Sequence, residues 1–355
     1  MLSRDIAGSD QAARGSVVCI GAFDGVHLGH RGVLARVRER ALALNLTSVV
    51  TSFEPLPRDF FARGRPVARL SSLRDKIEQF GAAGIEQLLL LRFNAAMAAM
   101  SAQNFVERIL VERLKAREVW VGAGFRFGHA RNGDFALLER LGREHGFAAN
   151  ALEPVVLEGE RISSSAIRDA LAGGSFALAA RWLGRPFTIG GHVARGQQLG
   201  RKLGYPTANL HLGRRTAPVV GIFAVRVHGL DQAFARCVEA HRARGLAPDA
   251  GREGPGCLAR PWMAELSNDR RGAAEPRPGW PGVASLGVRP TVNGKEPLLE
   301  SHLFDFDGDL YGKRIQVEFV EKLRDEEKFS DLDAMVRQID RDAAQAREIL
   351  GVAKK

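Results

Sequence analysis

Residues 21–30 read GAFDGVHLGH and separate a short apolar run, Val17–Ile20, from a stretch in which apolar residues recur every three or four positions. The run predicts a buried strand and the recurrence predicts a helix, so these ten residues form a turn from strand to helix. Such a turn directs backbone N–H groups and the positive end of the helix dipole at one place. The sequence therefore predicts a phosphate-binding turn in an α/β domain.

Two histidines stand in this turn. His27 and His30 are three positions apart, which places both imidazoles on one side of the opening helical turn. Gly21 and Gly29 allow the backbone to approach a ligand closely. Two imidazoles at a phosphate site indicate charge stabilisation during transfer to a nucleotide, with an incidental surface pair and a zinc site as the alternatives.

Short apolar runs continue through the first half of the chain, and helix-like spacing separates them. Strands that alternate with helices predict a parallel sheet covered by helices on both faces. The runs are Val17–Ile20, Ser48–Phe53, Leu88–Phe93 and Val119–Val121. We assign residues 1–184 to this Rossmann-like domain.

The second half changes character from Pro186 onward, where glycines and short alternating runs dominate. This pattern predicts a small antiparallel β-barrel or sandwich. Apolar residues on one face from Leu332 to Leu350 predict a C-terminal helix that packs on the barrel, with Ser330 as its N-cap. We assign residues 185–355 to this domain. Its predicted strands are Phe223–Val227, Val283–Leu286, Leu299–Phe304 and Ile315–Val320.

A stretch at about 230–281 fits neither pattern, because Arg, Ala, Gly and Pro dominate it. Such a composition buries too little apolar surface to offset the entropy of ordering. We interpret most of it as a mobile insertion.

The composition limits the classes of protein. A length of 355 residues with 45% hydrophobic residues predicts two globular domains. No apolar run is long enough to cross a bilayer, and three scattered cysteines favour neither disulfides nor a thiolate zinc site, so we expect a cytoplasmic protein. The net charge of +10 is spread evenly over both halves, which argues against a nucleic-acid partner.

A second segment with chemical potential reads RISSSAIR at residues 161–168. Ser163, Ser164 and Ser165 stand at the start of a helix that runs to about Leu171, and capping alone is their commonest role. Arg168, one turn further along, adds a planar cation suited to a triphosphate.

The second half carries its own glycine-rich segment. Gly190, Gly196, Gly200 and Gly204 lead into YPTAN at residues 205–209. The segment predicts a flexible loop that wraps a phosphate and ends in a hydroxyl, from Thr207, and an amide, from Asn209, that hold hydrated Mg²⁺. A glycine-rich turn of the barrel is the alternative.

These motifs resemble a known family. The histidine turn followed by the serine segment is similar to nucleotidyltransferases whose helix-start histidines bind ATP, specifically the adenylyltransferase half of the bacterial bifunctional riboflavin kinase/FAD synthetase family. The run GYPTAN looks like the signature of riboflavin kinases. Further blocks resemble the family at residues 51–58, 69–80, 125–134, 183–186, 287–291, 299–306, 310–313 and 322–329.

The resemblance implies a nucleotidyltransferase-type fold followed by a riboflavin kinase barrel. It also implies two reactions: riboflavin and ATP give FMN, and FMN and ATP give FAD and pyrophosphate, both with Mg²⁺. The small molecules ATP, riboflavin and FMN are then the expected partners. His27, His30 and Arg168 are expected to act on the triphosphate, and Glu300 is expected to be the base for the riboflavin hydroxyl. The implied contacts to bound substrates come from Gly21, Phe23, Asp24, Gly29, Ser163, Ser164, Ser165, Gly190, Gly196, Gly200, Gly204, Pro206 and Asn209, with Thr207 and Asn209 at the metal.

The chain departs from the family pattern at two places. Leu56 replaces a histidine, and Ala123–Gly124 stands where an acidic residue is usual. These departures leave two alternatives: a kinase without adenylyltransferase activity, and a flavin- or nucleotide-binding regulator that contacts RNA. The oligomeric state is not predicted.

Overall fold

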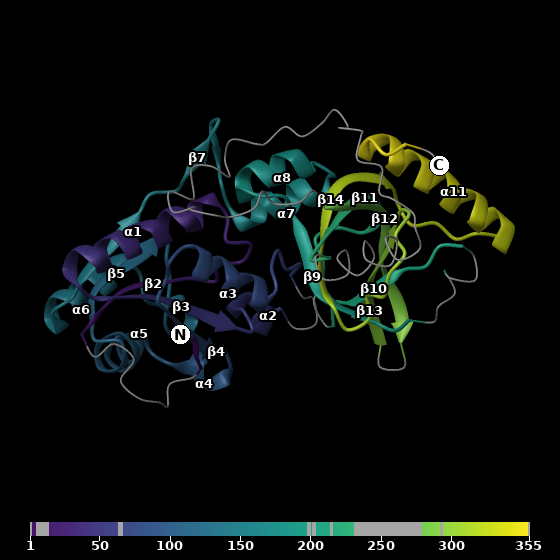
Figure 1. Cartoon of the computed structure of the whole chain (residues 1–355). Coiled ribbons are helices and arrows are strands. Elements are labelled where there is room, and N and C mark those ends of the chain that lie inside the picture. The colour runs from purple at the N-terminus through teal and green to yellow at the C-terminus, as the bar shows by residue number, and fades with distance from the viewer. Residues whose placement is uncertain are drawn as a thin grey trace. The chain divides into compact units, whose positions relative to one another are not determined.

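The computed structural model describes residues 2–4, 14–62, 67–196, 200, 204–213, 216–230, 279–291 and 294–353. The chain divides into two compact units, an N-terminal unit at Met1–Asp169 and a C-terminal unit at Ala170–Lys355. Figure 1 shows the elements of both. Each unit is described by itself.

The N-terminal unit contains a six-stranded parallel sheet in the order β1-β4-β3-β2-β5-β6. The prediction of a parallel sheet is confirmed, while the outer strands β1 and β6 were not predicted. The strand order reverses beside β2, and ligands of open α/β sheets bind at such a switch point, outside the carboxyl ends of the strands. The strands are β1 (Leu2–Arg4), β2 (Ser16–Ile20), β3 (Thr47–Glu54), β4 (Gln87–Arg92), β5 (Ala116–Gly122) and β6 (Ala148–Leu152).

Helices cover both faces of this sheet, as predicted. Alternate residues of a strand point to opposite faces, and β2 shows the result: Val17 and Cys19 pack in a core with Leu34 of α1, whereas Val18 and Ile20 pack in another. The helical elements are α1 (Leu28–Leu44), α2 (Pro57–Phe61), α3 (Leu73–Ala82), α4 (Ala95–Ala99), α5 (Ala102–Phe105), the π-helix η1 (Val106–Arg113), the 3₁₀ helix η2 (His129–Arg131), α6 (Phe135–His145) and α7 (Ser164–Ala172). A small hairpin, β7 (Val156–Leu157) and β8 (Glu160–Arg161), precedes α7.

The C-terminal unit is a closed antiparallel barrel in the order β10-β13-β12-β11-β14-β9, and the pairing of β10 with β9 closes it. The structure therefore selects the barrel over the sandwich. Strands β9 and β10 were not predicted, because they lie in the glycine-rich segment that we interpreted as loop. The strands are β9 (Thr188–Ala194), β10 (Ala208–His211), β11 (Gly221–His228), β12 (Trp280–Thr291), β13 (Gly294–Leu303) and β14 (Arg314–Arg324).

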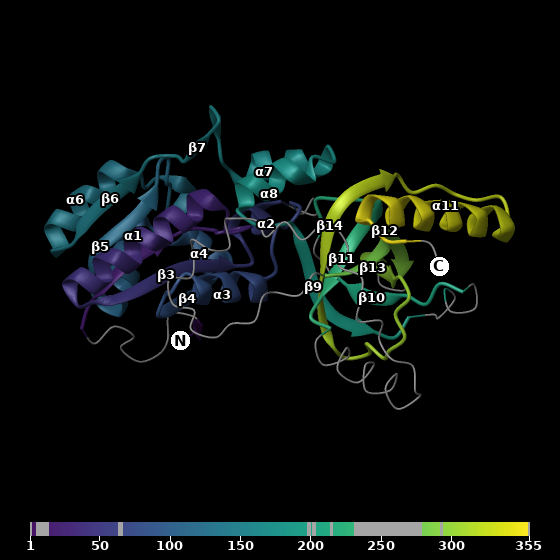
Figure 2. The same ribbon diagram turned by 45° about the horizontal axis from the view of Figure 1, so that its top comes forward.

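The predicted C-terminal helix is present as α11 (Leu332–Leu350) and packs on the barrel, along which it lies in Figures 1 and 2. The expected cap was wrong by one residue. Asp331 is the N-cap, and its carboxylate accepts a hydrogen bond from the Ala334 N–H at 2.7 Å. Ser330 instead donates a hydrogen bond to the Asp331 carboxylate at 2.9 Å. Aspartate is favoured over serine as the cap here because its negative charge also interacts favourably with the helix dipole.

The boundary between the units falls after Asp169, whereas we assigned the first domain to residues 1–184. The helix α8 (Phe176–Leu183) accounts for the difference, since Phe176 stacks on Phe319 and meets Phe223 edge-on in the barrel core. The predicted insertion at about 230–281 lies almost entirely outside the described residues.

Candidate active sites

The turn after β2 is the first candidate site. His27 is the N-cap of α1, and its Nδ1 accepts a hydrogen bond from the His30 backbone N–H at 3.4 Å. An imidazole that accepts at Nδ1 and is neutral carries its proton on Nε2, where it can donate to a ligand. Phe23 and Val26 adopt positive φ angles of 50° and 40°, a rare backbone conformation that persists only where surrounding contacts impose it. The turn is thus a strained, tightly held loop at the N-terminus of a long helix.

The two imidazoles form one aromatic stack, as the spacing predicts. Their ring centroids lie 3.7 Å apart at an interplanar angle of 20°, and the Phe23 ring lies 5.1 Å from that of His30. His30 Nδ1 is buried and has no hydrogen-bond partner within the described part of the chain. Burial, followed by the charges of His27 and Lys76, holds the pKa of His30 well below its usual value. His30 is therefore a neutral donor or acceptor near pH 7 rather than a cation.

Glycine at position 29 serves this stack. A Cβ atom there would lie 3.1 Å from the His27 ring, closer than ordinary packing allows. Gly21 directly follows β2, and its N–H donates to the Thr51 carbonyl at 3.1 Å. Both glycines therefore stand inside the turn, next to the imidazoles.

Asp24 is buried and accepts hydrogen bonds from the backbone N–H groups of Leu70 and Ser71 at 3.1 and 3.2 Å. The guanidinium of Arg168 forms an ion pair with the same carboxylate and donates to the carbonyls of Ala68 and Ser164 at 2.6 and 3.0 Å. We expected Arg168 to contact a triphosphate. Its observed contacts make it a positioning residue for the turn, and direct contact with ATP stays a prediction.

The three serines divide their roles. The Ser163 hydroxyl accepts a hydrogen bond from the Ala166 N–H at 3.1 Å, so Ser163 caps the start of α7. Ser164 donates to the Asp24 carbonyl at 2.9 Å and so ties the start of α7 to the turn. Ser165 is exposed. The structure thus brings the two distant motifs together through Ser164 and Arg168.

A buried lysine behind the turn was missed by the sequence analysis. The side chain of Lys76 on α3 is 1% exposed; its Nζ lies 3.5 Å from the Ala22 carbonyl and 3.8 Å from Glu54. Arg69 pairs with Glu54 at 3.0 Å and with Asp59 at 2.5 Å. The sequence signal that could have revealed this residue is the position of Lys76 on the apolar face of α3, one turn before Phe80. The site therefore rests on a network of charges, in which Lys76 is buried and Glu54, Asp59 and Arg69 are partly buried.

Aromatic rings gather where β3 and β4 end. Phe53, Phe60, Phe61 and Phe93 meet edge-on, with centroids 5.4 to 5.9 Å from Phe93. Phe61 is 61% exposed. Exposed aromatic faces at the ligand-binding edge of a parallel sheet suit a planar ring system.

The barrel holds the second candidate site. Glu300 on β13 lies opposite Asn209 on β10 and Ser285 on β12, and residues opposite each other in a ladder project to the same face. Glu300, Asn209 and Thr207 line one cavity of about 610 Å³, here named the Glu300 cavity. The structure therefore brings together the predicted base and the predicted metal ligands.

Asn209 is built into this wall. Its Nδ2 donates to the Thr207 carbonyl at 3.4 Å, while its Oδ1 is buried without a hydrogen-bond partner among the described residues. A Cβ atom on Gly196 would lie 2.6 Å from Asn209 Nδ2, so the chain needs glycine where it passes the amide. A buried, unpaired amide oxygen beside a hydroxyl fits a hard cation such as Mg²⁺.

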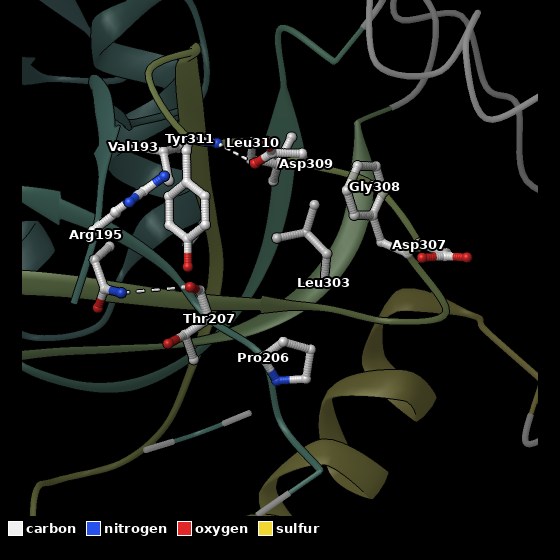
Figure 3. A pocket seen from close by; sticks show the side chains of 13 residues that line it. Val193, Arg195, Pro206, Thr207, Leu303, Asp307, Gly308, Asp309, Leu310 and Tyr311 are labelled. Carbon is white, nitrogen blue, oxygen red and sulfur yellow. Dashed lines mark hydrogen bonds between the residues drawn. The ribbon is translucent and has the colours of Figure 1, made fainter. Parts of the chain in front are cut away.

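A second cavity of about 750 Å³ adjoins the same wall and is shown in Figure 3. Tyr311, Asp309 and Phe306 line it together with Thr207 and Asn209. We name it the Tyr311 cavity. The barrel thus offers two neighbouring spaces, and Thr207, Asn209 and Arg195 line both of them.

Comparisons with known proteins assign both halves of the chain to families. The sequence matches the FAD synthetase family over residues 9–166 and the riboflavin kinase family over residues 183–350. It is 40% identical to the bifunctional riboflavin kinase/FMN adenylyltransferase of Escherichia coli strain K12, over 99% of each chain. The protein of the same name from Pseudomonas fluorescens is 42% identical, over 95% of this chain and 93% of the relative. The chain belongs to the bifunctional riboflavin kinase/FMN adenylyltransferase family.

The family membership assigns the two units. The turn after β2 belongs to the FAD synthetase domain, and the barrel belongs to the riboflavin kinase domain, so the protein is a transferase with both activities. A crystal structure described as a macrolide-efflux protein from Streptococcus pneumoniae has a similar fold, with a TM-score of 0.68, 25% identity and 98% coverage of each chain. Across the described residues, no helix is long and apolar enough to cross a bilayer.

The remaining predicted residues of the riboflavin kinase domain lie at different distances from its cavities. Gly200 lines the Glu300 cavity, and Pro206 lines the Tyr311 cavity. Gly204 has a φ of 86° just before Tyr205. Gly190 lies within β9, opposite Gln316, and is not among the residues that line either cavity. Contact of Gly190 with substrate therefore stays a prediction.

Three residues of the kinase site were missed. Arg195 lines both cavities, and Tyr311 lines the Tyr311 cavity. His302 lines the Glu300 cavity, where its Nδ1 lies 2.9 Å from the Pro206 carbonyl. Burial lowers the pKa of His302. The alternation along β13 was the available signal, because His302 stands two residues after Glu300 and shares its face.

Proposed function

We propose that the two cavities of the barrel hold the two substrates of riboflavin kinase. Riboflavin takes the Glu300 cavity and ATP takes the Tyr311 cavity. The observation that carries this assignment is the shared wall: Thr207 and Asn209 line both cavities, and Glu300 faces Asn209 across the ladder.

The walls of the Glu300 cavity suit a flavin. Apolar side chains from the barrel, the segment after β14 and α11 give a planar ring system an apolar bed, while Glu300, Asn209 and His302 supply a polar end for a ribityl chain. The apolar lining residues are Ile222, Val283, Leu298, Phe329, Met335 and Ile339.

Phosphorylation of riboflavin requires a base, because the 5′-hydroxyl is neutral. Glu300 accepts the proton of this hydroxyl while the oxygen attacks the γ-phosphorus, and the bond to the β,γ-bridging oxygen breaks with its electron pair leaving on ADP. The placement of Glu300 in the wall next to Asn209 supports this role.

Thr207 and Asn209 are the residues that we propose to hold Mg²⁺, in agreement with the buried and unpaired Asn209 Oδ1. The cation supplies charge that shields the polyphosphate from the incoming oxygen. The chain itself fixes the Asn209 amide through Thr207 and through the close approach of Gly196.

Adenylyl transfer at the first site needs no general base, since the attacking FMN phosphate is already anionic. An oxygen of this phosphate bonds to the α-phosphorus of ATP, and the α,β-bridging bond breaks with its electron pair leaving on pyrophosphate. His27 donates from Nε2, His30 acts as a neutral hydrogen-bonding group, and the N-terminus of α1 faces the charge. Asp24, Arg168 and Ser164 hold the turn in place.

We place the FMN ring on the exposed aromatic faces at the ends of β3 and β4, where Phe60 and Phe61 are available. These two rings follow β3, which lies next to β2 in the sheet. We further propose that the protein works in the cytoplasm on free small molecules without a nucleic-acid partner. The free thiol of Cys19 agrees with a compartment in which disulfides are rare.

One chromatogram tests the whole proposal. The protein is incubated with riboflavin, ATP and Mg²⁺, and the flavins are separated. We expect FMN and FAD. FMN without FAD would show that the histidine turn does not support adenylyl transfer. The absence of both FMN and FAD would overturn both site assignments.

A further inference from the structure

The wall between the two cavities identifies where phosphoryl transfer takes place. Among the described residues, three line both spaces: Arg195, Thr207 and Asn209. If ATP and riboflavin occupy neighbouring cavities, the transferred group must cross this wall. Thr207 and Asn209 are neutral, so Arg195 is the cation that the described part of the wall offers to the transferring phosphoryl group.

The place of Arg195 is set by local structure. It directly follows β9, and its guanidinium carbon lies 5.5 Å from the centre of the Tyr311 ring. Cation–π contacts of this length hold a guanidinium over an aromatic face. Figure 3 shows Arg195 beside Tyr311 in the cavity that Thr207 also lines. Tyr311 is itself fixed, because its N–H donates to the Asp309 carboxylate at 2.9 Å.

The other arginine of these cavities is already engaged. Arg324 lines the Glu300 cavity, but its guanidinium binds Asp342 through contacts of 2.7 to 3.1 Å. Arg195 makes no ion pair with a carboxylate of the described residues and is exposed to solvent. An arginine held by an aromatic ring keeps its donors available for phosphate oxygens.

We propose that Arg195 is a catalytic residue of the riboflavin kinase reaction and that Tyr311 positions it. The inference rests on the proposed placement of the two substrates. As the 5′-oxygen bonds to the γ-phosphorus and ADP leaves, negative charge spreads over the phosphoryl oxygens and the β,γ-bridging oxygen. The Arg195 guanidinium donates hydrogen bonds to these oxygens, which stabilises the transition state more than the ground state. The proton still passes to Glu300.

The test compares Arg195→Gln, Arg195→Lys and Tyr311→Leu with Arg341→Gln, which removes an exposed arginine of α11 that lines neither cavity. We expect Arg195→Gln to lower kcat for FMN formation by about 10²-fold or more with a much smaller change in the KM for ATP. Arg195→Lys recovers part of the rate, since it keeps the charge without the planar fork. We expect Tyr311→Leu to form FMN at a rate between those of Arg195→Gln and Arg195→Lys. Arg341→Gln leaves the rate of FMN formation unchanged.

Two further readouts separate catalysis from folding. FAD formation from supplied FMN takes place in the other domain and is expected to stay normal in every variant. Added guanidinium ion is expected to raise the rate of Arg195→Gln but not that of the wild type. A kcat for Arg195→Gln within about threefold of the wild type, or a change confined to KM, overturns the inference.

Glu300→Gln, measured alongside, distinguishes the inference from the proposed function. If Glu300→Gln loses FMN formation and Arg195→Gln keeps it, the site is correctly placed and Arg195 is not part of the chemistry. If both keep it, the placement of the substrates itself is wrong.

Discussion

The carboxylate of Asp24 and the guanidinium of Arg168 form a buried ion pair between positions 144 residues apart in the sequence. Asp24 belongs to the turn after β2, and Arg168 belongs to the helix α7. The pair therefore links two motifs that the chain keeps far apart, and it shapes the turn that we propose as the adenylyl-transfer site.

Removing one partner of this pair should destabilise the FAD synthetase domain. Arg168→Met leaves the Asp24 carboxylate buried without its partner, which costs about 3 to 5 kcal/mol in comparable cases. We expect lower thermal stability and a loss of FAD formation, while FMN formation continues. Arg140→Met is the control, because Arg140 and Glu144 form an exposed pair whose loss has little effect. Equal stability of the two variants would contradict the buried role of Arg168.

His30 should be required for one reaction only. His30→Ala removes a hydrogen-bonding group from the histidine stack, and loss of such a group from a transition state reduces rates by about 10² to 10³-fold. We expect FAD synthesis to collapse while riboflavin is still converted to FMN. Normal FAD synthesis by this variant would show that the ATP site has been misplaced.

Burial of His30 also predicts an effect of pH on stability. Burial is the largest cause that lowers the pKa of His30 well below 6.5 in the folded protein, and the nearby charges of His27 and Lys76 lower it further. As the pH falls below about 6.5, His30 binds a proton in the unfolded chain but not in the folded chain. The free energy of unfolding therefore decreases from that pH down to the pKa of His30 in the folded protein. The slope for one group is at most about 1.4 kcal/mol per pH unit. The free energy of unfolding measured in urea should therefore decrease between about pH 7 and pH 5 more steeply for the wild type than for His30→Gln. Parallel pH profiles would show that His30 titrates normally.

Glu300→Gln separates base function from packing. The amide keeps the size and hydrogen bonding of the carboxylate but cannot take a proton, and loss of a general base costs about 10² to 10⁴-fold. We expect a normally folded variant that makes no FMN from riboflavin and still makes FAD from supplied FMN. Near-normal FMN production would return Glu300 to a purely structural role in the strand.

The segment from Gln232 to Pro278 should be dispensable. Val227 of β11 pairs with Trp280 of β12 in the antiparallel ladder, so a short turn can join the two strands. Loop-closure entropy changes only slowly with loop length. Replacing the segment by a short Gly/Ser linker should leave both activities within a few-fold, as measured by flavin chromatography. Failure to fold, or loss of FMN formation, would show that the segment contributes to the barrel.

The sequence predicted most of both cores because strands and helices bury residues at fixed periods. The four strands predicted in each half are present. The strands β9 and β10 were missed for a physical reason: Gly190, Gly191 and the short run Ala208–His211 carry little alternation of their own. They are strands because the barrel needs them to close, and closure is a property of the whole sheet.

The sequence by itself determined which residues stand next to one another along the chain. That was enough for the stacked histidines at the start of α1, and for the hydroxyl and amide of the YPTAN segment, since local backbone geometry places neighbours. The tertiary structure alone decided the rest: that Arg168 binds Asp24, that Asn209 faces Glu300, and that Arg195 stands between two cavities. The physical reason is that sheet order and barrel closure select partners distant in sequence, and burial then sets their charge and hydrogen bonding.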